Sequence, residues 1–434
     1  MKKVYFRTLG CKVNQYETEA MEELFVKRGY QIAEDIDSCD VYVVNTCTVT
    51  HVSDAKSRQQ LNRVKKRNPK AVVAVVGCYA QVASDEMKAL DHVDVILGTK
   101  ARSKLVDFVE EVMRTGKRQI HVTDLDLDRD YDSLSIQSEF NNTRAYVKIQ
   151  EGCDMYCSYC IIPYARGHIA SRPLSSILDE VAKLAKRAFQ EIVLTGIHVA
   201  SYGRDLHEDI DLVDVCEQVS AIEGVKRIRL SSMEPRFIRK DRLERLSKLK
   251  TFCDHFHLSL QSGSDKILKK MNRKYDKELF QEKVNLIRSY FPDCAITTDV
   301  IVGFPGETEE DFLETMDFCK QIAFSRIHVF PFSPREGTPA YDFLDQVDAK
   351  IKKDRSNRLI ALAEVLQKDF LQSQLGKTKE VLFEEYSKDS QYLYGYTTNY
   401  IRVKTAYDKE KINQIKDFVL ESMANDLAVG EVER

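Results

Sequence analysis

Short apolar runs alternate with amphipathic segments along the first part of the chain. The apolar runs are typical of buried β-strands and lie at residues 4–9, 41–44, 71–76 and 93–97. Segments with helical periodicity follow them at residues 16–28, 53–67, 84–90 and 103–114. Because strands that alternate with helices build parallel βαβ units, we predict an N-terminal parallel α/β domain over residues 1–118.

The second part of the chain repeats this alternation after a polar break. Residues 119–143 are acidic and polar without clear periodicity, so we interpret them as a linker. Strand-like runs then follow at residues 145–150, 191–195, 226–231, 255–260, 296–302 and 326–330, with helical segments between them. Six βα repeats predict a partial (β/α)6 barrel, which we place at residues 144–372.

The last part of the chain changes character after a long amphipathic helix at residues 349–375. Three β-like runs follow at 379–385, 391–397 and 400–404, and we predict a small C-terminal β-barrel over residues 373–434. Its aromatic and basic side chains are Tyr392, Tyr394, Tyr396, Tyr400, Arg402 and Lys404. They either stack the bases and contact the phosphates of an RNA, or are tyrosines of ordinary half-buried strands.

Composition excludes several classes of protein. The 434 residues carry a net charge of −3, no apolar run is long enough to span a bilayer, and the N-terminus lacks the apolar region of a secretory signal. We therefore expect a cytoplasmic protein with no membrane partner. Because acidic and basic residues nearly balance, nucleic acid could bind only at a local basic patch. Basic runs occur at residues 56–70 and 350–358. Each run is either a solvated face or a phosphate-contacting face.

Cys153, Cys157 and Cys160 form a CxxxCxxC cluster. Three thiolates at this spacing can hold three irons of a four-iron, four-sulfur cluster and leave the fourth iron open to S-adenosylmethionine (SAM). An electron from such a cluster can cleave SAM to a 5′-deoxyadenosyl radical. The alternative is a zinc site, but zinc usually takes four closely spaced ligands, and no fourth Cys or His is adjacent. We predict that these cysteines are metal ligands with a catalytic role.

Cys11, Cys47 and Cys78 share a different context. Each follows the end of a predicted strand. Since the carboxyl ends of parallel strands lie along one edge of a sheet, the three thiols can converge there and hold a second four-iron, four-sulfur cluster. The alternative is that they are buried core cysteines. The remaining cysteines lack this pattern and are interpreted as packing residues: Cys39, Cys216, Cys253, Cys294 and Cys319.

The CxxxCxxC cluster and its flanks, from Gly152 to Gly167, resemble the radical-SAM superfamily. The resemblance implies that Tyr159 places an aromatic ring against the SAM adenine. It also implies that strand ends at Gly196, Gln261 and Gly303 bind the amino, carboxylate and ribose groups of SAM. Arg166 either supplies a cation close to the cluster or forms a structural salt bridge.

The order of the three predicted domains resembles the methylthiotransferase family over essentially the whole chain, and the C-terminal part looks like its TRAM domain. Residues 8–17 (TLGCKVNQYE), 45–50 (NTCTVT) and 77–81 (GCYAQ) resemble the branch that modifies threonylcarbamoyladenosine beside the tRNA anticodon. The isopentenyladenosine branch typically has Gln-Met-Asn after its first cysteine, and the ribosomal-protein branch has Pro-Lys-Asn. The implied partners are a tRNA anticodon stem-loop and an electron donor protein.

The resemblance also implies a reaction. One SAM methylates a sulfur on the cluster of Cys11, Cys47 and Cys78, and a second SAM yields the radical that removes hydrogen from carbon 2 of the adenine, where methylthio is then attached. The base is expected to be splayed out of its loop. Three alternatives remain: methylthiolation of isopentenyladenosine or of a ribosomal protein, a non-catalytic iron–sulfur RNA-binding protein, and another radical-SAM reaction in which the N-terminal cluster relays electrons.

Overall fold

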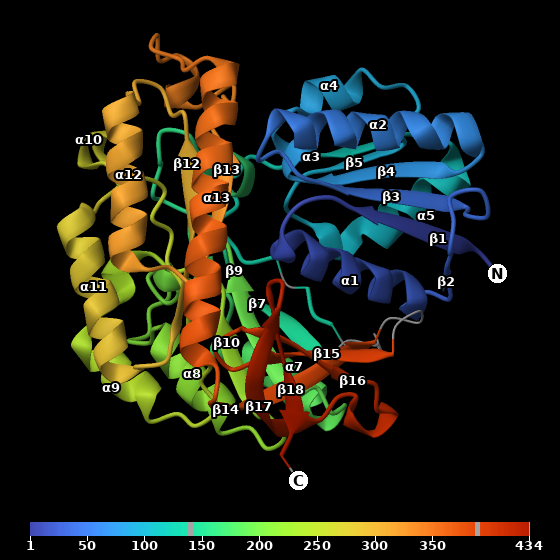
Figure 1. Ribbon diagram of the computed structural model, residues 1–434. Helices are drawn as coiled ribbons and strands as arrows, with labels where there is room; N and C mark the ends of the chain where they lie inside the picture. The colour runs from blue at the N-terminus through green and yellow to red at the C-terminus, as the bar shows by residue number, and fades with distance from the viewer. Residues whose placement is uncertain (133, 137–142, 387–390, 434) are drawn as a thin grey trace.

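The N-terminal unit is a parallel sheet with helices on both faces, as the alternating pattern predicted. A computed structural model describes residues 1–132, 134–136, 143–386 and 391–433 (Figure 1). The strands of this sheet are β1 (Lys3–Thr8), β2 (Gln31–Ile32), β3 (Val41–Thr46), β4 (Val72–Gly77), β5 (Val95–Leu97) and β6 (Gln119–His121), in the order β2-β1-β3-β4-β5-β6. Its helices are α1 (Lys12–Lys27), α2 (His51–Arg67), α3 (Cys78–Val82), α4 (Ser84–Lys88) and α5 (Leu105–Thr115).

Two apolar clusters hold these helices on the sheet. Met21 and Phe25 of α1 pack with α5 on one face, and Leu61 and Val64 of α2 pack on the other face. Strands β3 and β4 are buried on both faces and therefore appear in the sequence as continuous apolar runs. The edge strands β2 and β6 were not predicted because they have only two and three residues. With β6, the sheet continues past residue 118 into the segment interpreted as a linker, of which residues 133 and 137–142 lie outside the described residues.

The central unit confirms the predicted partial (β/α)6 barrel. Its strands are β7 (Arg144–Glu151), β8 (Ala170–Ser171), β9 (Glu191–Gly196), β10 (Arg227–Leu230), β11 (His255–His257), β12 (Ala295–Val302) and β13 (Arg326–Pro331). Parallel sheets β10-β9-β7 and β11-β12-β13 are joined by the bridges Ile228–Phe252 and Met233–Leu258, and the short β8 adds an antiparallel edge. The helices are α6 (Ile162–Arg166), α7 (Leu174–Lys186), α8 (Leu212–Ser220), α9 (Lys240–Ser247), α10 (Asp265–Lys270), α11 (Lys277–Tyr290), α12 (Glu309–Ile322) and α13 (Ala349–Gln374).

The C-terminal unit is the predicted small β-barrel. Its strands are β14 (Thr378–Tyr386), β15 (Tyr392–Thr397), β16 (Arg402–Ala406), β17 (Ile415–Ala424) and β18 (Leu427–Val432), closed in the order β14-β15-β16-β18-β17. Val381, Phe383 and Phe418 fill its interior. Strands β17 and β18 were not predicted from the sequence.

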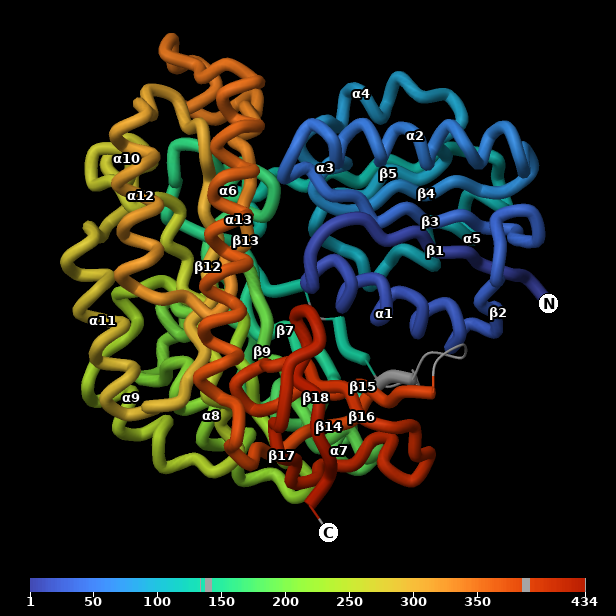
Figure 2. The backbone as a smooth tube through the Cα atoms, viewed as in Figure 1, coloured from blue at the N-terminus to red at the C-terminus, as the bar shows by residue number. Residues whose placement is uncertain are grey.

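The N-terminal unit and the small barrel lie on the same side of the central unit, as Figure 2 shows. Arg335 of the central unit forms a buried ion pair with Asp54 of α2 at 2.5 Å. Arg229 of β10 donates to the carbonyl of Thr398 in the small barrel at 2.9 Å. None of the helices in the described ranges combines the length and apolar character that a bilayer crossing requires.

Candidate functional site

Cys11, Cys47 and Cys78, the first trio, lie together at one edge of the N-terminal sheet. Cys47 follows β3, Cys78 follows β4, and Cys11 is the N-cap of α1 just after β1. These strands are neighbours and parallel, which is why their ends meet. A side chain at Gly10, whose φ is +115°, would approach the Cβ of Cys47 to 2.9 Å. The three thiols also act electrostatically on one another.

Cys153, Cys157 and Cys160, the second trio, occupy the loop between β7 and α6. The loop is fixed by backbone hydrogen bonds, from Cys153 to the Gly167 carbonyl at 3.0 Å and from Cys160 to the Cys157 carbonyl at 2.9 Å. Gly152 has a φ of +68°, and a Cβ there would collide with the carbonyl oxygen of His168. The turn before the first cysteine therefore requires glycine.

The donors of both trios suit a cluster better than a single ion. In the described parts of the chain, neither trio brings its three sulfurs within 4.8 Å of one another. Thiolates around one tetrahedral zinc would lie closer, at roughly 3.8 Å, given a Zn–S distance of about 2.3 Å. Burial raises the pKa of Cys153 to about 11 and the pKa values of Cys78 and Cys160 to about 12. The free side chains are thus thiols, and metal binding must displace their protons.

The two trios adjoin across the interface between the N-terminal and central units. Helix α6 follows Cys160 and packs against α3, which begins at Cys78. Arg166 ends α6, and its Nε donates to the Sγ of Cys78 at 3.2 Å. Of the two functions proposed for Arg166 from the sequence, the structural salt bridge is present, because the same guanidinium also pairs with Glu17 at 2.7 Å. The cation is next to the first trio rather than the second.

A buried ionic network surrounds this contact. Glu17 of α1 pairs with Arg102 at 2.5 Å and with Lys148 at 2.9 Å, and Glu151 of β7 pairs with Arg102 at 3.1 Å. Although burial opposes ionisation, Arg102, Arg166 and Lys148 hold the pKa of Glu17 well below its usual range. The sequence did not reveal this network, since its members are far apart along the chain and none belongs to a recognisable motif.

A cavity lies beside the second trio, at the interface with the N-terminal unit. Tyr159, Cys160 and Gln261 line it with Phe330 from the central unit, and Val49 and Thr50 line it from the N-terminal unit. The Tyr159 ring packs edge-on against Phe304 at 6.4 Å between centroids. The structure thus brings two of the predicted SAM-binding residues, Tyr159 and Gln261, beside the second trio.

The other two predicted SAM-binding residues do not line this cavity. Gly196 ends β9 against Gln150, where a Cβ would lie 2.8 Å from the Gln150 carbonyl oxygen. The backbone N–H of Gly303 donates to Glu307 at 2.8 Å, and the side chain of Lys352 covers the position of a Cβ. These contacts give both glycines a packing role in the protein without ligands.

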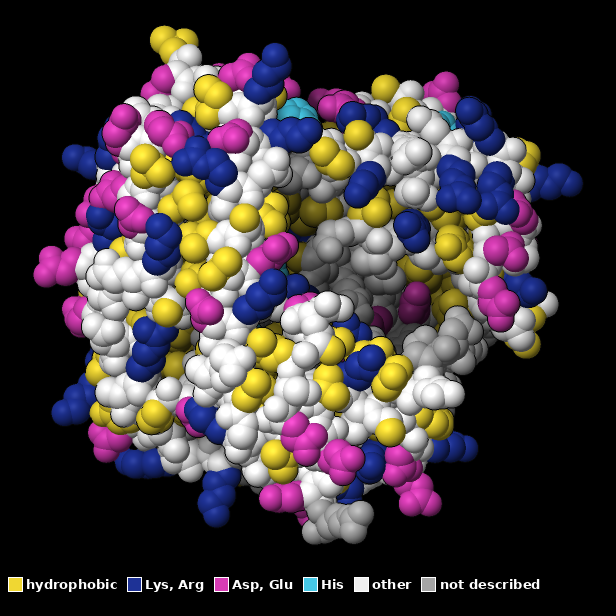
Figure 3. All heavy atoms as spheres, viewed as in Figure 1, with side chains coloured by type: hydrophobic (Ala, Val, Ile, Leu, Met, Phe, Trp, Pro, Cys, Tyr) yellow, Lys and Arg dark blue, Asp and Glu magenta, His cyan; other side chains and the backbone are white. Residues whose placement is uncertain are grey.

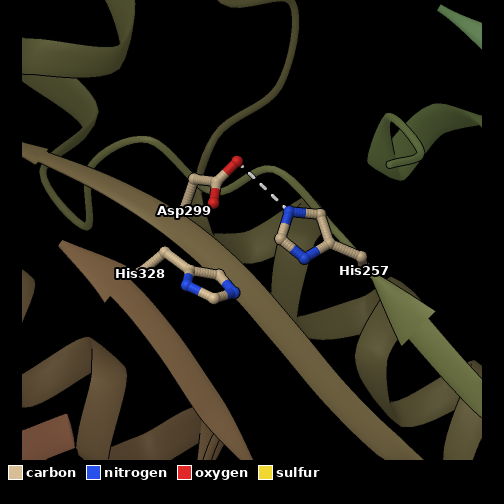
Figure 4. Close-up of side chains that lie close together, drawn as sticks. All are labelled: His257, Asp299 and His328. Carbon is tan, nitrogen blue, oxygen red and sulfur yellow. Dashed lines mark hydrogen bonds and ion pairs between the residues drawn. The ribbon is translucent and has the colours of Figure 1, made fainter. Parts of the chain in front are cut away.

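One polar group was missed from the sequence because its members lie on three separate strands. His257, Asp299 and His328 face one another from β11, β12 and β13 (Figure 4). Two histidines and a carboxylate resemble a metal-binding set. However, the ring nitrogens of His257 already bond Thr297 at 2.9 Å and Asp299 at 3.2 Å. Since Asp299 also lines the cavity, we interpret the group as its polar wall.

The aromatic and basic residues predicted for RNA contact divide into two groups. Tyr400 stacks on His255 at 4.7 Å, and the Arg229 guanidinium lies 4.6 Å from its ring centroid, so this tyrosine docks the small barrel on the central unit. Tyr392 is 42% exposed, although the Lys404 ammonium lies over one face of its ring at 3.6 Å from the centroid. Of the two basic runs, the one on α2 is mostly exposed, whereas Arg355 of the other is buried against Glu307.

Comparisons with known proteins agree with this arrangement. The chain matches the radical SAM superfamily over residues 147–319 and a family described as "Uncharacterized protein family UPF0004" over residues 3–98. It is 41% identical to the threonylcarbamoyladenosine tRNA methylthiotransferase MtaB of Bacillus subtilis over 96% of this chain and 93% of the relative. It is 39% identical to the Aquifex aeolicus protein of that name, over 94% and 98%. A tRNA-2-methylthio-N(6)-dimethylallyladenosine synthase of Natranaerobius thermophilus is 36% identical, over 96% and 93%.

Among solved structures, the fold resembles the radical SAM methyltransferase TsrM of Kitasatospora setae, with a TM-score of 0.59, 14% identity and coverage of 79% and 77% of the two chains. The chain belongs to the radical-SAM methylthiotransferase family. Membership confirms that it is an enzyme with SAM and four-iron, four-sulfur clusters as cofactors. Membership therefore excludes one alternative left open by the sequence, a non-catalytic iron–sulfur RNA-binding protein.

Proposed function

We propose that this enzyme attaches a methylthio group to carbon 2 of N6-threonylcarbamoyladenosine in tRNA, next to the anticodon. Relatives named for this reaction are 41%, 39% and 37% identical to the chain, and a relative named for the dimethylallyl substrate is 36% identical. The observation that carries the proposal is the contact from Arg166 to Cys78, because it joins the helix that follows the second trio to a cysteine of the first trio.

Each trio would hold one cluster. Cys153, Cys157 and Cys160 would bind the cluster whose open iron takes SAM, and Cys11, Cys47 and Cys78 would bind the auxiliary cluster. When bound, these groups supply one-electron chemistry that can break an unactivated aromatic C–H bond, together with a sulfur for transfer. Tyr159, with the buried Phe304 packed edge-on against it, would form an apolar wall for the adenine of SAM, and Gln261 would offer its amide to the polar groups of SAM. An electron donor protein would supply the reducing equivalent.

The substrate base would enter through the hollow where the three units meet, which Figure 3 shows on this face of the molecule. An adenine in a tRNA loop can leave its stack more easily than a paired base, and modifying enzymes bind such extruded bases. Tyr392 of the small barrel would stack on a base of the anticodon stem-loop, and Lys404 would pair with a phosphate. The exposed lysines of α2 add positive charge for phosphates.

We assign the distinction between substrate arms to Lys12. A threonylcarbamoyl arm ends in a carboxylate, whereas a dimethylallyl arm is apolar. Lys12 is exposed beside Cys11, and its ammonium lies 5.6 Å from the Tyr146 ring. Its positive charge also lowers the pKa values of His328 of the central unit and Tyr400 of the small barrel. An ion pair from this ammonium to the carboxylate would favour the charged arm.

Mass spectrometry of tRNA nucleosides tests the function directly. Cells that lack the gene should lose methylthio-threonylcarbamoyladenosine, and re-expression should restore it. Re-expression of Cys11→Ala or Cys157→Ala should not restore it, whereas Cys39→Ala, a buried cysteine outside both trios, should. If the nucleosides do not change in cells without the gene, the proposed substrate is wrong.

A further inference from the structure

We propose that two arginines, Arg166 and Arg273, give the two cluster sites different reduction potentials, because each donates an N–H to one cysteine sulfur but only Arg166 has its charge neutralised by carboxylates. Arg166 contacts Cys78 of the first trio, and Arg273 contacts Cys157 of the second trio, both at 3.2 Å. The inference rests on the cluster sites proposed above.

Arg166 is completely enclosed and all of its donor directions are used. Besides Cys78, its guanidinium donates to Asn14 at 3.0 Å and to Glu17 at 2.7 and 3.1 Å, and it also contacts Glu151. Asn14 in turn accepts a weak contact from the Sγ of Cys11 at 3.5 Å and donates to the carbonyl of Thr46 at 2.9 Å. The arginine is therefore held against the first trio by two carboxylates and an amide.

Arg273 has a different set of partners. Its Nε donates to the hydroxyl of Tyr275 at 3.0 Å, and its guanidinium lies 4.8 Å from the centroid of that ring. A further N–H reaches the carbonyl of Ser259 at 3.5 Å. In the residues that the structure describes, no carboxylate pairs with Arg273. Of these partners, the sulfur of Cys157, as an iron-bound thiolate, would therefore most directly balance the positive charge of Arg273.

The different partners of Arg166 and Arg273 should affect the reduction potentials of the two clusters differently. Hydrogen bonds and positive charge at a cluster sulfur stabilise the reduced, more negative state and raise the reduction potential. Glu17 and Glu151 offset the charge of Arg166 within a buried network that they share with Arg102 and Lys148, where Asp132 also pairs with Arg102. In the part of the chain that the structure describes, no ion pair joins a carboxylate to Arg273. Arg273 should therefore raise the reduction potential of the second-trio cluster more than Arg166 raises that of the first-trio cluster. One electron from a low-potential reductant would then go preferentially to the site that binds SAM.

Potentiometric titration monitored by electron paramagnetic resonance measures this effect without turnover. The full chain is prepared in two backgrounds, with the first trio changed to alanine or with the second trio changed to alanine, so that each retains one cluster. Dithionite is the reductant and SAM is omitted. In the background with only the second trio, we expect Arg273→Gln to lower the equilibrium constant for one-electron reduction about tenfold, which is about 59 mV. Arg273→Lys, which keeps the charge, should restore much of the loss.

In the background with only the first trio, Arg166→Gln should lower the reduction potential by less than Arg273→Gln lowers it in the other background. Because that change leaves Glu17 and Glu151 with one fewer buried cation, although both still pair with Arg102 and Lys148, Glu17→Gln provides a second variant. Glu17→Gln should raise the potential by removing a compensating charge. Arg239→Gln, which alters an exposed pair with Asp241, is the control and should leave both potentials unchanged.

The outcomes separate this inference from the proposed function. A parent protein that binds no iron at either trio contradicts the cluster sites themselves. Variants that hold full iron but keep the parent potentials contradict the inference alone. If Arg273→Gln weakens SAM binding without a change in potential, Arg273 is a SAM contact and not a tuning residue. Equal shifts for Arg273→Gln and Arg166→Gln would also overturn the proposal, because they would remove the role of carboxylate compensation.

Discussion

The Nε of Arg166 lies 3.2 Å from the Sγ of Cys78, although Arg166 belongs to the central unit and Cys78 to the N-terminal unit. The contact ties the helix that follows one cysteine trio to the helix that begins at a cysteine of the other. It ties together two domains with separate cores, because a residue of the central unit donates a hydrogen bond to a cysteine of the first trio. Changes at this interface should therefore affect both trios together.

Gly152→Ala should abolish the cluster of the second trio. The substitution puts a Cβ against the carbonyl of His168 and forces an unfavourable left-handed φ, so the loop that carries Cys153 must move. Iron analysis should show about four fewer irons per chain. Gly116→Ala is the matched control, because its φ of +67° is nearly the same and nothing lies within 4 Å of the new Cβ. Similar iron loss in both variants would contradict the steric argument.

Arg335→Ala should loosen the N-terminal unit from the central unit. The change leaves Asp54 buried without its 2.5 Å partner and removes a donor to Thr48, which follows Cys47. Losing one member of a buried pair costs about 3–5 kcal/mol. Urea unfolding should show this decrease, while Arg239→Ala in an exposed pair should cost no more than about 1 kcal/mol. Equal midpoints for the two variants would mean that the interface does not depend on Arg335.

Cluster assembly should release protons and become more favourable as the pH rises. Burial raises the pKa values of Cys78 and Cys160 to about 12, so these thiols are protonated near neutral pH and must ionise to bind iron. Reconstitution in weak buffer with a pH indicator should show acidification. Cys319→Ala should release as many protons as the parent, although burial raises its pKa to about 12 as well, because it belongs to neither trio. Equal proton release from the parent and from a protein without the trio cysteines would contradict the prediction that these thiols ionise when they bind iron.

Lys12→Gln should reduce discrimination between substrate arms. Loss of a charged hydrogen bond of about 1.5–3 kcal/mol corresponds to a decrease of roughly 10- to 100-fold in kcat/KM for RNA that carries threonylcarbamoyladenosine. RNA with an isopentenyl arm should be unaffected, and so should SAM cleavage without RNA. Lys27→Gln, at the other end of α1, is the control. An equal decrease on both RNAs would show that Lys12 serves phosphate binding or folding instead.

Much of this architecture could be predicted from the sequence because its signals are local. Strand–helix alternation predicted both α/β units, and the position of Cys11, Cys47 and Cys78 after successive strands predicted their convergence. Contacts between distant residues could not be predicted in this way. Arg166 and Glu17 are 149 positions apart, and only the docking of two units joins them. The role of Tyr400 was ambiguous for the same reason, since its stacking partner His255 lies on another unit.

The most direct test of the central claim uses purified, reconstituted enzyme and two anticodon stem-loops, one with threonylcarbamoyladenosine and one with isopentenyladenosine. Products are measured by mass spectrometry after addition of SAM and dithionite. We predict methylthio incorporation into the first RNA, little into the second, and none with the Cys11→Ala or Cys157→Ala protein. Preferential modification of the isopentenyl RNA, or unchanged product in either cysteine variant, would contradict the account.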